Sequence, residues 1–170
     1  MGYKLTVSGI VEESAVDGPG LRYTVFVQGC PHACPGCHNP QTHPFEGGRQ
    51  VDTDDLLRDI LQNPLLTGVT FSGGEPFCQP RSLAMLAKAV HQHSRLNVIT
   101  YSGYTWEELT NNPNQHVRGL LEQTDILIDG RYLETQRDLT LRFRGSTNQR
   151  VLDAKKSLAQ GKPVAADGNW

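Results

Sequence analysis

The sequence has few of the features that mark membrane, secreted or nucleic-acid-binding proteins. No apolar run approaches the roughly 18 residues that a membrane span needs, and residues 1–7 lack the apolar stretch of a secretory signal. The 16 basic residues are balanced by 18 acidic ones, a formal net charge of −2, which provides neither a basic surface for nucleic acid nor a polybasic membrane anchor. We therefore expect a soluble, cytoplasmic protein without nucleic-acid or membrane partners.

Hydrophobic residues are scarce as well, at 37% of the chain. They nevertheless fall in clear runs of valine, isoleucine, leucine and phenylalanine, so disorder throughout the chain is not expected. A length of 170 residues suits one domain, and no linker or low-complexity stretch suggests a second. We expect a single domain over residues 1–160 and a flexible C-terminal tail over residues 161–170.

Strand-like and helix-like segments alternate along the chain. The apolar patterns predict strands over residues 5–12, 21–27, 68–72, 96–101 and 125–129. They predict helices over residues 54–62 (with Thr53 as the N-cap), 82–93, 106–109, 117–122 and 151–158. This order is typical of βα units, which form a mainly parallel sheet with crossover helices. Because a closed eight-stranded barrel usually needs about 200 residues or more, we expect an α/β fold with a partial, TIM-like βα barrel or an open sheet.

Four unusual loops follow the predicted strands directly. They are the cysteine-rich segment after residue 27 and the short segments 73–76, 102–104 and 130–132. In parallel sheets, ligands bind at the carboxyl ends of the strands. We therefore place the functional site where these four loops meet.

The cysteines point to a metal or redox centre. Three of the four lie within eight residues, CPHACPGC, as Cys30, Cys34 and Cys37, and the fourth is Cys78. Without a secretory signal, and with a chain long enough to bury a core, disulfides are not needed. Clustered thiols in a reducing compartment are more typical of metal ligands.

Three kinds of centre could use these thiols. A structural zinc ion would need a fourth ligand, either Cys78 or one of the histidines His32, His38 and His43. A ferredoxin would need a fourth thiolate at a matching distance, and Cys78 lies far downstream. The third is a [4Fe–4S] cluster held by three thiolates, whose fourth iron stays open for a substrate, as the open position of a catalytic zinc site does.

A second motif favours the cluster with an open iron. The strand over residues 68–72 ends in Gly73 and Gly74, followed by Glu75 and Pro76. Glycine has no Cβ, so a small zwitterion such as the methionine part of S-adenosylmethionine can approach the backbone closely. On its own, the motif would fit an ordinary turn in which the proline ends the strand.

With both motifs in place, the chain resembles the radical S-adenosylmethionine superfamily. Within it, the chain is similar to the activating proteins of anaerobic (class III) ribonucleoside-triphosphate reductases. The resemblance covers about residues 11–151. Its motifs lie at residues 17–22 (DGPGLR), 29–39 (GCPHACPGCHN), 72–76 (SGGEP), 102–104 (SGY), 129–132 (DGRY) and 144–149 (RGSTNQ). Gly36 departs from the wider superfamily, many of whose members carry an aromatic residue just before the third cysteine, but it agrees with the reductase-activating group.

The resemblance implies a radical enzyme whose substrate is another protein. Cys30, Cys34 and Cys37 would bind a [4Fe–4S] cluster, and its open iron would bind S-adenosylmethionine through the amino and carboxylate groups. An electron from a donor such as reduced flavodoxin would cleave S-adenosylmethionine to methionine and a 5′-deoxyadenosyl radical. This radical would take a hydrogen from a glycine Cα of the reductase and leave a glycyl radical there.

The resemblance also implies which residues contact the cofactor. Gly73 and Gly74 would meet the methionine end, and groups at Gly36, Cys37 and His38 would meet the nucleoside. No catalytic side chain beyond the cofactor ligands is expected.

Some polar residues keep two interpretations. Asp129 is expected either to accept hydrogen bonds from ribose or to cap a helix or turn. Asn148 and Gln149 could contact the ligand or hold a local turn. Arg22 could orient the incoming glycine loop or pair with a carboxylate.

Two alternatives remain open at this stage. Within the enzyme class, the substrate could be another glycyl-radical enzyme or a small molecule, as in deazaguanine synthesis. From a different class, the chain could be a non-catalytic zinc or iron–sulfur module. That module would need Cys78 or a histidine to complete the ligand set, and it would not bind S-adenosylmethionine.

Overall fold

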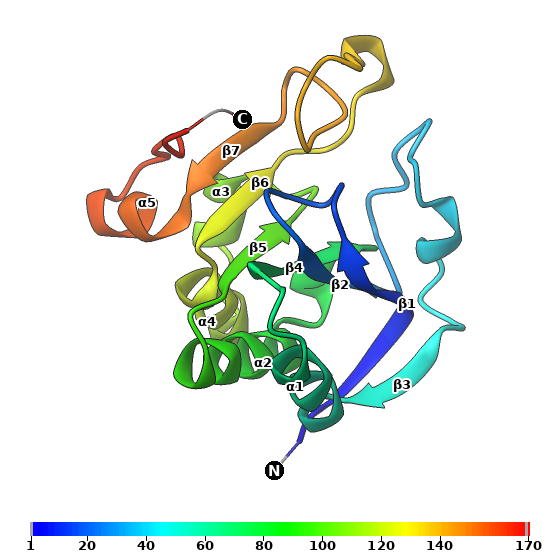
Figure 1. Cartoon of the computed structure of the whole chain (residues 1–170). Helices are drawn as coiled ribbons and strands as arrows, with labels where there is room; N and C mark the ends of the chain where they lie inside the picture. Colours follow the sequence, from blue (N-terminus) through cyan, green and yellow to red (C-terminus); the bar gives the residue numbers. More distant parts are fainter. Residues whose placement is uncertain (1, 169) are drawn as a thin grey trace.

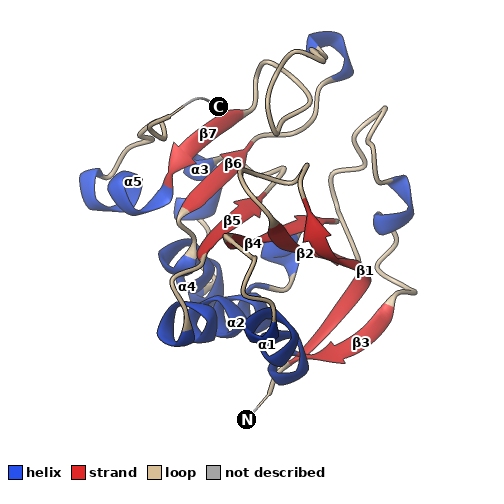
Figure 2. Ribbon diagram, in the orientation of Figure 1, coloured by secondary structure: helices blue, strands red, loops and turns tan. Residues whose placement is uncertain are grey.

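The computed structural model describes residues 2–168 and 170 and contains a seven-stranded sheet (Figures 1 and 2). Its strands are β1 (Lys4–Ser14), β2 (Arg22–Val27), β3 (Arg49–Asp52), β4 (Gly68–Gly73), β5 (Asn97–Tyr101), β6 (Ile126–Asp129) and β7 (Arg150–Asp153). The helices are α1 (Thr53–Gln62), α2 (Pro80–His93), α3 (Trp106–Thr110), α4 (Gln115–Gln123) and α5 (Ala154–Gln160). Among these described residues, no helix is both long and apolar enough to cross a membrane.

The centre of the sheet is parallel and its edges are antiparallel. The strand order is β3-β1-β2-β4-β5-β6-β7, in which β2, β4, β5 and β6 run parallel. β1 and β3 join one side, and β7 the other, with antiparallel pairing. The edge strands β3 and β7 are at opposite ends of this order, so the sheet stays open. The expected partial βα barrel with a mainly parallel centre is confirmed.

The two faces of the sheet bury different residues. On one side, Val25 of β2 and Phe71 of β4 pack in the main core with Leu83, Leu86 and Val90 of α2. The helices α1, α2 and α4 gather on this side in Figure 1. A second, smaller cluster consists of Ile99, Ile128 and Val151, with Tyr101 and Phe143 packed against it. It joins β5, β6 and β7 to the segments near the cavity described below.

Arg22 is part of the fold and not of the site. Its side chain is 1% exposed and donates hydrogen bonds to Thr70 Oγ1 and Asn97 Oδ1, both at 2.7 Å, and to the Pro19 carbonyl at 3.2 Å. Arg22 pairs with Gly68, the first residue of β4, so it lies at the amino ends of the parallel strands. It therefore joins the amino ends of β4 and β5 to the turn before β2, away from the carboxyl ends where the cysteine loop begins.

Three details differ from the sequence-based expectations. The N-cap of α1 is Asp52, whose carboxylate accepts a hydrogen bond from the Asp54 N–H at 2.8 Å, whereas Thr53 is the first residue of the helix. The strand β3 was not predicted. The segment 151–158, expected to be a helix, is divided between strand β7 and helix α5.

The segment after α5 lies along β7. The Asp153 N–H donates to the Val164 carbonyl at 2.8 Å, and the Ala166 N–H donates to the Val151 carbonyl at 3.0 Å. Trp170 packs edge-on against Phe143. Residues 164–166 thus extend the sheet edge by backbone pairing, where the sequence suggested only a flexible tail.

Candidate active site

A cavity of about 390 Å³ opens at the carboxyl ends of the parallel strands. Residues from all four of the loops singled out in the sequence line it, together with residues 16–17 and the segment 143–149. Its volume lies within the range of about 300–1,000 Å³ found for small-molecule sites. The topology brings the loops together here because β2, β4, β5 and β6 all end at the same edge.

The three loop cysteines all line this cavity. Cys30, Cys34 and Cys37 are half-buried and unpaired. At the start of the loop, the Cys30 N–H donates to the His43 carbonyl at 3.0 Å, and within it the Cys37 N–H donates to the Cys34 carbonyl at 3.1 Å. The structure therefore brings together the three residues that the sequence proposed as iron ligands.

Burial and backbone hydrogen bonds shift the pKa of two of these thiols in opposite directions. Burial raises the pKa of Cys30, while hydrogen bonds from the backbone of His32 and Ala33 act to lower it. Burial also raises the pKa of Cys34, and a backbone hydrogen bond from Tyr132 opposes this. These N–H groups favour the thiolate, which is the form that binds iron.

The donor set suits a cluster better than a single ion. One zinc ion needs four ligands, each about 2.0–2.3 Å away. Within residues 2–168 and 170, no group of three His, Cys, Asp or Glu side chains is arranged to hold one ion. Cys78 is exposed and is not among the residues that line the cavity. Three thiols that line one cavity can each bind a different iron of a [4Fe–4S] cluster, which leaves the fourth iron without a protein ligand.

Gly73 and Gly74 bring the end of β4 against the start of the cysteine loop. Gly73 has φ +91°, and a Cβ there would lie 2.7 Å from Phe26 Cα. A Cβ at Gly74 would collide with the Gly29 carbonyl. The Gly74 N–H donates to the Val27 carbonyl at 2.8 Å. Both glycines are required by this packing, and their bare backbone lines the cavity.

Of the other predicted cofactor contacts, Cys37 and His38 line the cavity, whereas Gly36, Asp129 and Asn148 are not among its lining residues. Gly36 is exposed in the cysteine loop with φ +75°. Gln149, a second candidate in the loop of Asn148, does line the cavity.

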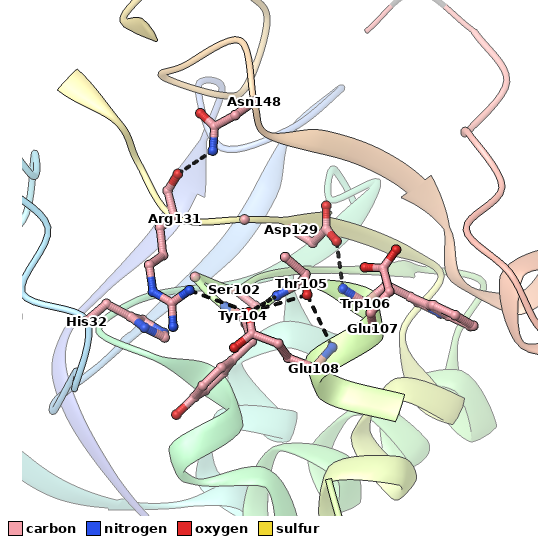
Figure 3. A network of polar contacts seen from close by, with 12 residues as sticks. His32, Ser102, Tyr104, Thr105, Trp106, Glu107, Glu108, Asp129, Arg131 and Asn148 are labelled. Carbon is pink, nitrogen blue, oxygen red and sulfur yellow. Dashed lines mark hydrogen bonds and ion pairs between the residues drawn. The ribbon is translucent and has the colours of Figure 1, made fainter. Parts of the chain in front are cut away.

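Asp129 and Asn148 hold loops in place, as Figure 3 shows. The Asp129 carboxylate accepts hydrogen bonds from the Trp106 N–H at 2.7 Å and from Arg150 Nε at 3.0 Å and Nη2 at 2.5 Å. Asn148 donates from Nδ2 to the Arg131 carbonyl at 2.8 Å. The structure thus gives Asp129 the capping role and not the expected ribose contact.

Sequence reasoning missed several lining residues. Asp17, Tyr101, Tyr132, Phe143 and Arg144 all face the cavity. The Tyr132 ring lies 5.3 Å from the His38 ring, centroid to centroid. Tyr101 donates from its hydroxyl to the Phe143 carbonyl at 2.6 Å. The position of Tyr101 at the last residue of a strand and that of Tyr132 in the loop after one were usable signals, whereas Phe143 and Arg144 had no such signal.

Comparison with known proteins agrees with this site. A family model described as "4Fe-4S single cluster domain" matches residues 16–152, a span that includes all three loop cysteines and the Gly-Gly turn. The chain is 35% identical over 144 residues to the anaerobic ribonucleoside-triphosphate reductase-activating protein of Haemophilus influenzae, covering 79% of this chain and 88% of that protein. It is 37% identical over 142 residues to the protein of the same name from Pasteurella multocida, with the same coverage. The chain belongs to this family of reductase-activating proteins.

A second group of activating enzymes is also related. The chain is 33% identical over 127 residues to the pyruvate formate-lyase-activating enzyme of Clostridium pasteurianum. That match covers 72% of this chain and 50% of that enzyme. The relatives are thus activating proteins and enzymes, and the matched domain is one that carries an iron–sulfur cluster.

Proposed function

We propose that the chain is a radical S-adenosylmethionine activase that generates a glycyl radical on an anaerobic ribonucleoside-triphosphate reductase. The observation that carries this proposal is the shared cavity. The thiols of Cys30, Cys34 and Cys37 and the bare backbone of Gly73 and Gly74 line the same space at the carboxyl ends of the parallel strands. The names of its relatives in the family support the reductase as the partner.

The loop cysteines and the glycine turn have separate tasks in this proposal. The cysteines would each hold one iron of a [4Fe–4S] cluster and leave one iron open to the amino and carboxylate groups of S-adenosylmethionine. When bound, the cluster would supply the electron that splits S-adenosylmethionine into methionine and the 5′-deoxyadenosyl radical, which takes a glycine Cα hydrogen from the reductase. Gly73 and Gly74 would admit the methionine end close to the backbone.

His38 and Tyr132 are our candidates for holding the nucleoside. Both rings line the cavity, with their centroids 5.3 Å apart and a tilt of 45°. Gly36 provides no aromatic ring before the third cysteine. Planar bases pack well on aromatic faces, so these two side chains would supply the surface that Gly36 lacks.

The glycine of the partner must enter through the open side of the cavity. Val16, 76% exposed, and Phe143 and Arg144 line this cavity together with Asp17. We propose that they meet the glycine-bearing loop of the reductase.

We further propose a small redox protein such as reduced flavodoxin as the electron donor, and a cytoplasmic location for the complex.

One alternative partner has an observation in its favour. The match to a pyruvate formate-lyase-activating enzyme suggests a different glycyl-radical enzyme as the substrate. That match covers only half of the relative, whereas the reductase-activating relatives are covered to 88%. The reductase is therefore the favoured partner.

The test is to form the radical on each candidate partner. The anaerobically reconstituted chain is mixed with reduced flavodoxin, S-adenosylmethionine and purified anaerobic reductase, and the glycyl radical is measured by EPR. Parallel samples replace the reductase with pyruvate formate-lyase or omit S-adenosylmethionine. We expect a glycyl radical on the reductase that needs S-adenosylmethionine. A radical on pyruvate formate-lyase alone, or on neither protein, would contradict the proposal.

A further inference from the structure

A buried histidine–carboxyl contact connects the cysteine loop to the Gly-Gly turn. His32, between the first two loop cysteines, places Nε2 2.7 Å from Oε1 of Glu75, the residue that follows Gly74. The two side chains are 4% and 0% exposed. A carboxylate so deeply buried is costly unless it is paired and fully hydrogen-bonded.

Glu75 meets that requirement by joining three loops. Besides His32, its carboxylate accepts hydrogen bonds from the Gly103 N–H at 2.8 Å, from the Ser102 hydroxyl at 3.0 Å and from the Phe77 N–H at 2.9 Å. Ser102 and Gly103 follow β5, whereas Phe77 follows the Gly-Gly turn. One carboxylate therefore ties the ends of β4 and β5 to the cysteine loop.

The ring of His32 packs closely against Gly103 and Tyr104. A Cβ on Gly103 would collide with the His32 ring, so this close approach needs glycine. The ring also contacts Tyr104 edge-on, with centroids 4.5 Å apart and planes at 76°. Figure 3 shows both side chains. This packing fixes the orientation of the imidazole.

The backbone of His32 acts on a proposed iron ligand at the same time. Its backbone makes a hydrogen bond to the thiol of Cys30, while its imidazole binds Glu75. Most other residues between 31 and 41 are exposed or half-exposed. His32 thus adds a side-chain link between the loop that carries the thiols and the loop that carries Gly73 and Gly74, which are also joined by the Glu75 N–H donating to the Gly29 carbonyl at 2.8 Å.

We infer that His32 and Glu75 are positioning residues that set the distance between the cluster and the turn that binds S-adenosylmethionine. The inference rests on the proposed function. Without the pair, the cysteines can still bind iron and the Glu75 N–H still holds the Gly29 carbonyl at 2.8 Å, but the loop beyond Cys30 loses its side-chain link to the Gly-Gly turn. The main loss should then be affinity for S-adenosylmethionine, since that ligand must touch both sides. A merely structural pair would instead lower stability and leave this affinity unchanged.

The chain contains a second histidine–carboxyl pair that serves as a control, although its side chains are 26% and 30% exposed. His91 places Nε2 2.8 Å from Asp125 Oδ2, nearly the same separation. This pair lies at the amino end of β6, where the Asp125 carboxylate also accepts the Val98 N–H at 2.7 Å. It is a histidine–carboxylate bond of similar length at the opposite edge of the sheet from the cavity.

The experiment compares His32→Gln, Glu75→Gln, their double variant and His91→Gln, each reconstituted anaerobically with iron and sulfide. Iron content, the dissociation constant for S-adenosylmethionine and the reduced EPR spectrum are measured. We expect the His32 and Glu75 variants to keep their cluster and to bind S-adenosylmethionine about tenfold or more weakly, as is typical when a group that orients a ligand is lost. The double variant should be no weaker than the worse single variant, because the pair acts as a unit.

His91→Gln should lower the melting temperature and leave the dissociation constant unchanged. If His32→Gln keeps full iron content and wild-type affinity for S-adenosylmethionine, the inference is overturned. If Glu75→Gln does not fold, the affinity of His32→Gln alone is the test. If the wild-type protein itself does not respond to S-adenosylmethionine, the proposed function fails, which is a separate result.

Discussion

Cys30, Cys34 and Cys37 line the cavity and Cys78 does not, so substitutions can test the two groups of cysteines separately. Replacing Cys30, Cys34 or Cys37 by alanine removes one of only three thiolates. We expect each variant to lose most of its iron after anaerobic reconstitution, measured as iron per chain and by the visible absorbance of the cluster. Cys78→Ala is the control and should retain the wild-type iron content, because Cys78 does not line the cavity. Loss of iron in Cys78→Ala would mean that four thiolates hold the centre.

Gly73 offers a second test on a single residue. Gly73→Ala must place a Cβ 2.7 Å from the Phe26 backbone at φ +91°, and backbone atoms cannot move aside cheaply. Gly47→Ala is the matched control, because Gly47 has φ +89° and open space around its Cβ position. We expect about 1–2 kcal/mol of lost stability from φ alone in the control, and about 1–3 kcal/mol more at Gly73 from overpacking. Denaturant unfolding of both apo-proteins measures the difference, and equal losses would contradict this packing account.

The site residues that could be predicted from the sequence are those that belong to short motifs of neighbouring residues. The spacing of three cysteines within eight residues indicates a metal centre by itself. Two adjacent glycines directly after a strand likewise indicate a close approach of a ligand to the backbone. Asp129 was harder, because its partners Trp106 and Arg150 come from other segments and compete with any ligand. A carboxylate at a strand end looks the same in the sequence whether it binds ribose or caps a helix.

At the scale of elements, the amino ends of the parallel strands depend on Arg22. Burial lowers the pKa of Arg22 to about 10, and the side chain spans β2, β4 and β5 through Thr70 and Asn97. We expect Arg22→Met to cost at least about 1.5–3 kcal/mol, the value of hydrogen bonds to a charged group. Urea unfolding would measure this loss.

The same variant also separates the fold from the site. Folded Arg22→Met protein should bind S-adenosylmethionine with wild-type affinity, since Arg22 lies at the edge of the sheet away from the cavity. A stable variant that has lost this affinity would instead place Arg22 in the site.

The elements that sequence patterns found are the long or strongly apolar ones. β2 and β4 are apolar runs, and α2 has a clear apolar stripe, so their periods were readable. β3 is a four-residue polar edge strand without alternation. Val151 and Leu152 lie inside β7, a strand of only four residues that leads directly into α5, and so short a run cannot be assigned to a strand or a helix from its pattern.

At the scale of the whole molecule, the open sheet explains how a small chain can act on another protein. The antiparallel edge strands β3 and β7 lie at opposite ends of the strand order, so the sheet does not close into a barrel around the cavity. In the proposed function, the glycyl radical would form close to the cluster, so the glycine of the partner would have to reach into the cavity. The alternation of strands and helices around a parallel centre could be predicted from the sequence. The approach of residues 143–149 to the cavity could not, because it depends on the packing of Phe143 with Tyr101 and Trp170.

The central claim is that three thiolates hold a [4Fe–4S] cluster whose open iron faces S-adenosylmethionine. Low-temperature EPR of the reduced, reconstituted protein with and without S-adenosylmethionine tests it most directly. The account predicts a reduced [4Fe–4S] signal whose shape changes when S-adenosylmethionine is added. A protein that holds one zinc ion, or a cluster whose spectrum does not respond to S-adenosylmethionine, would contradict it.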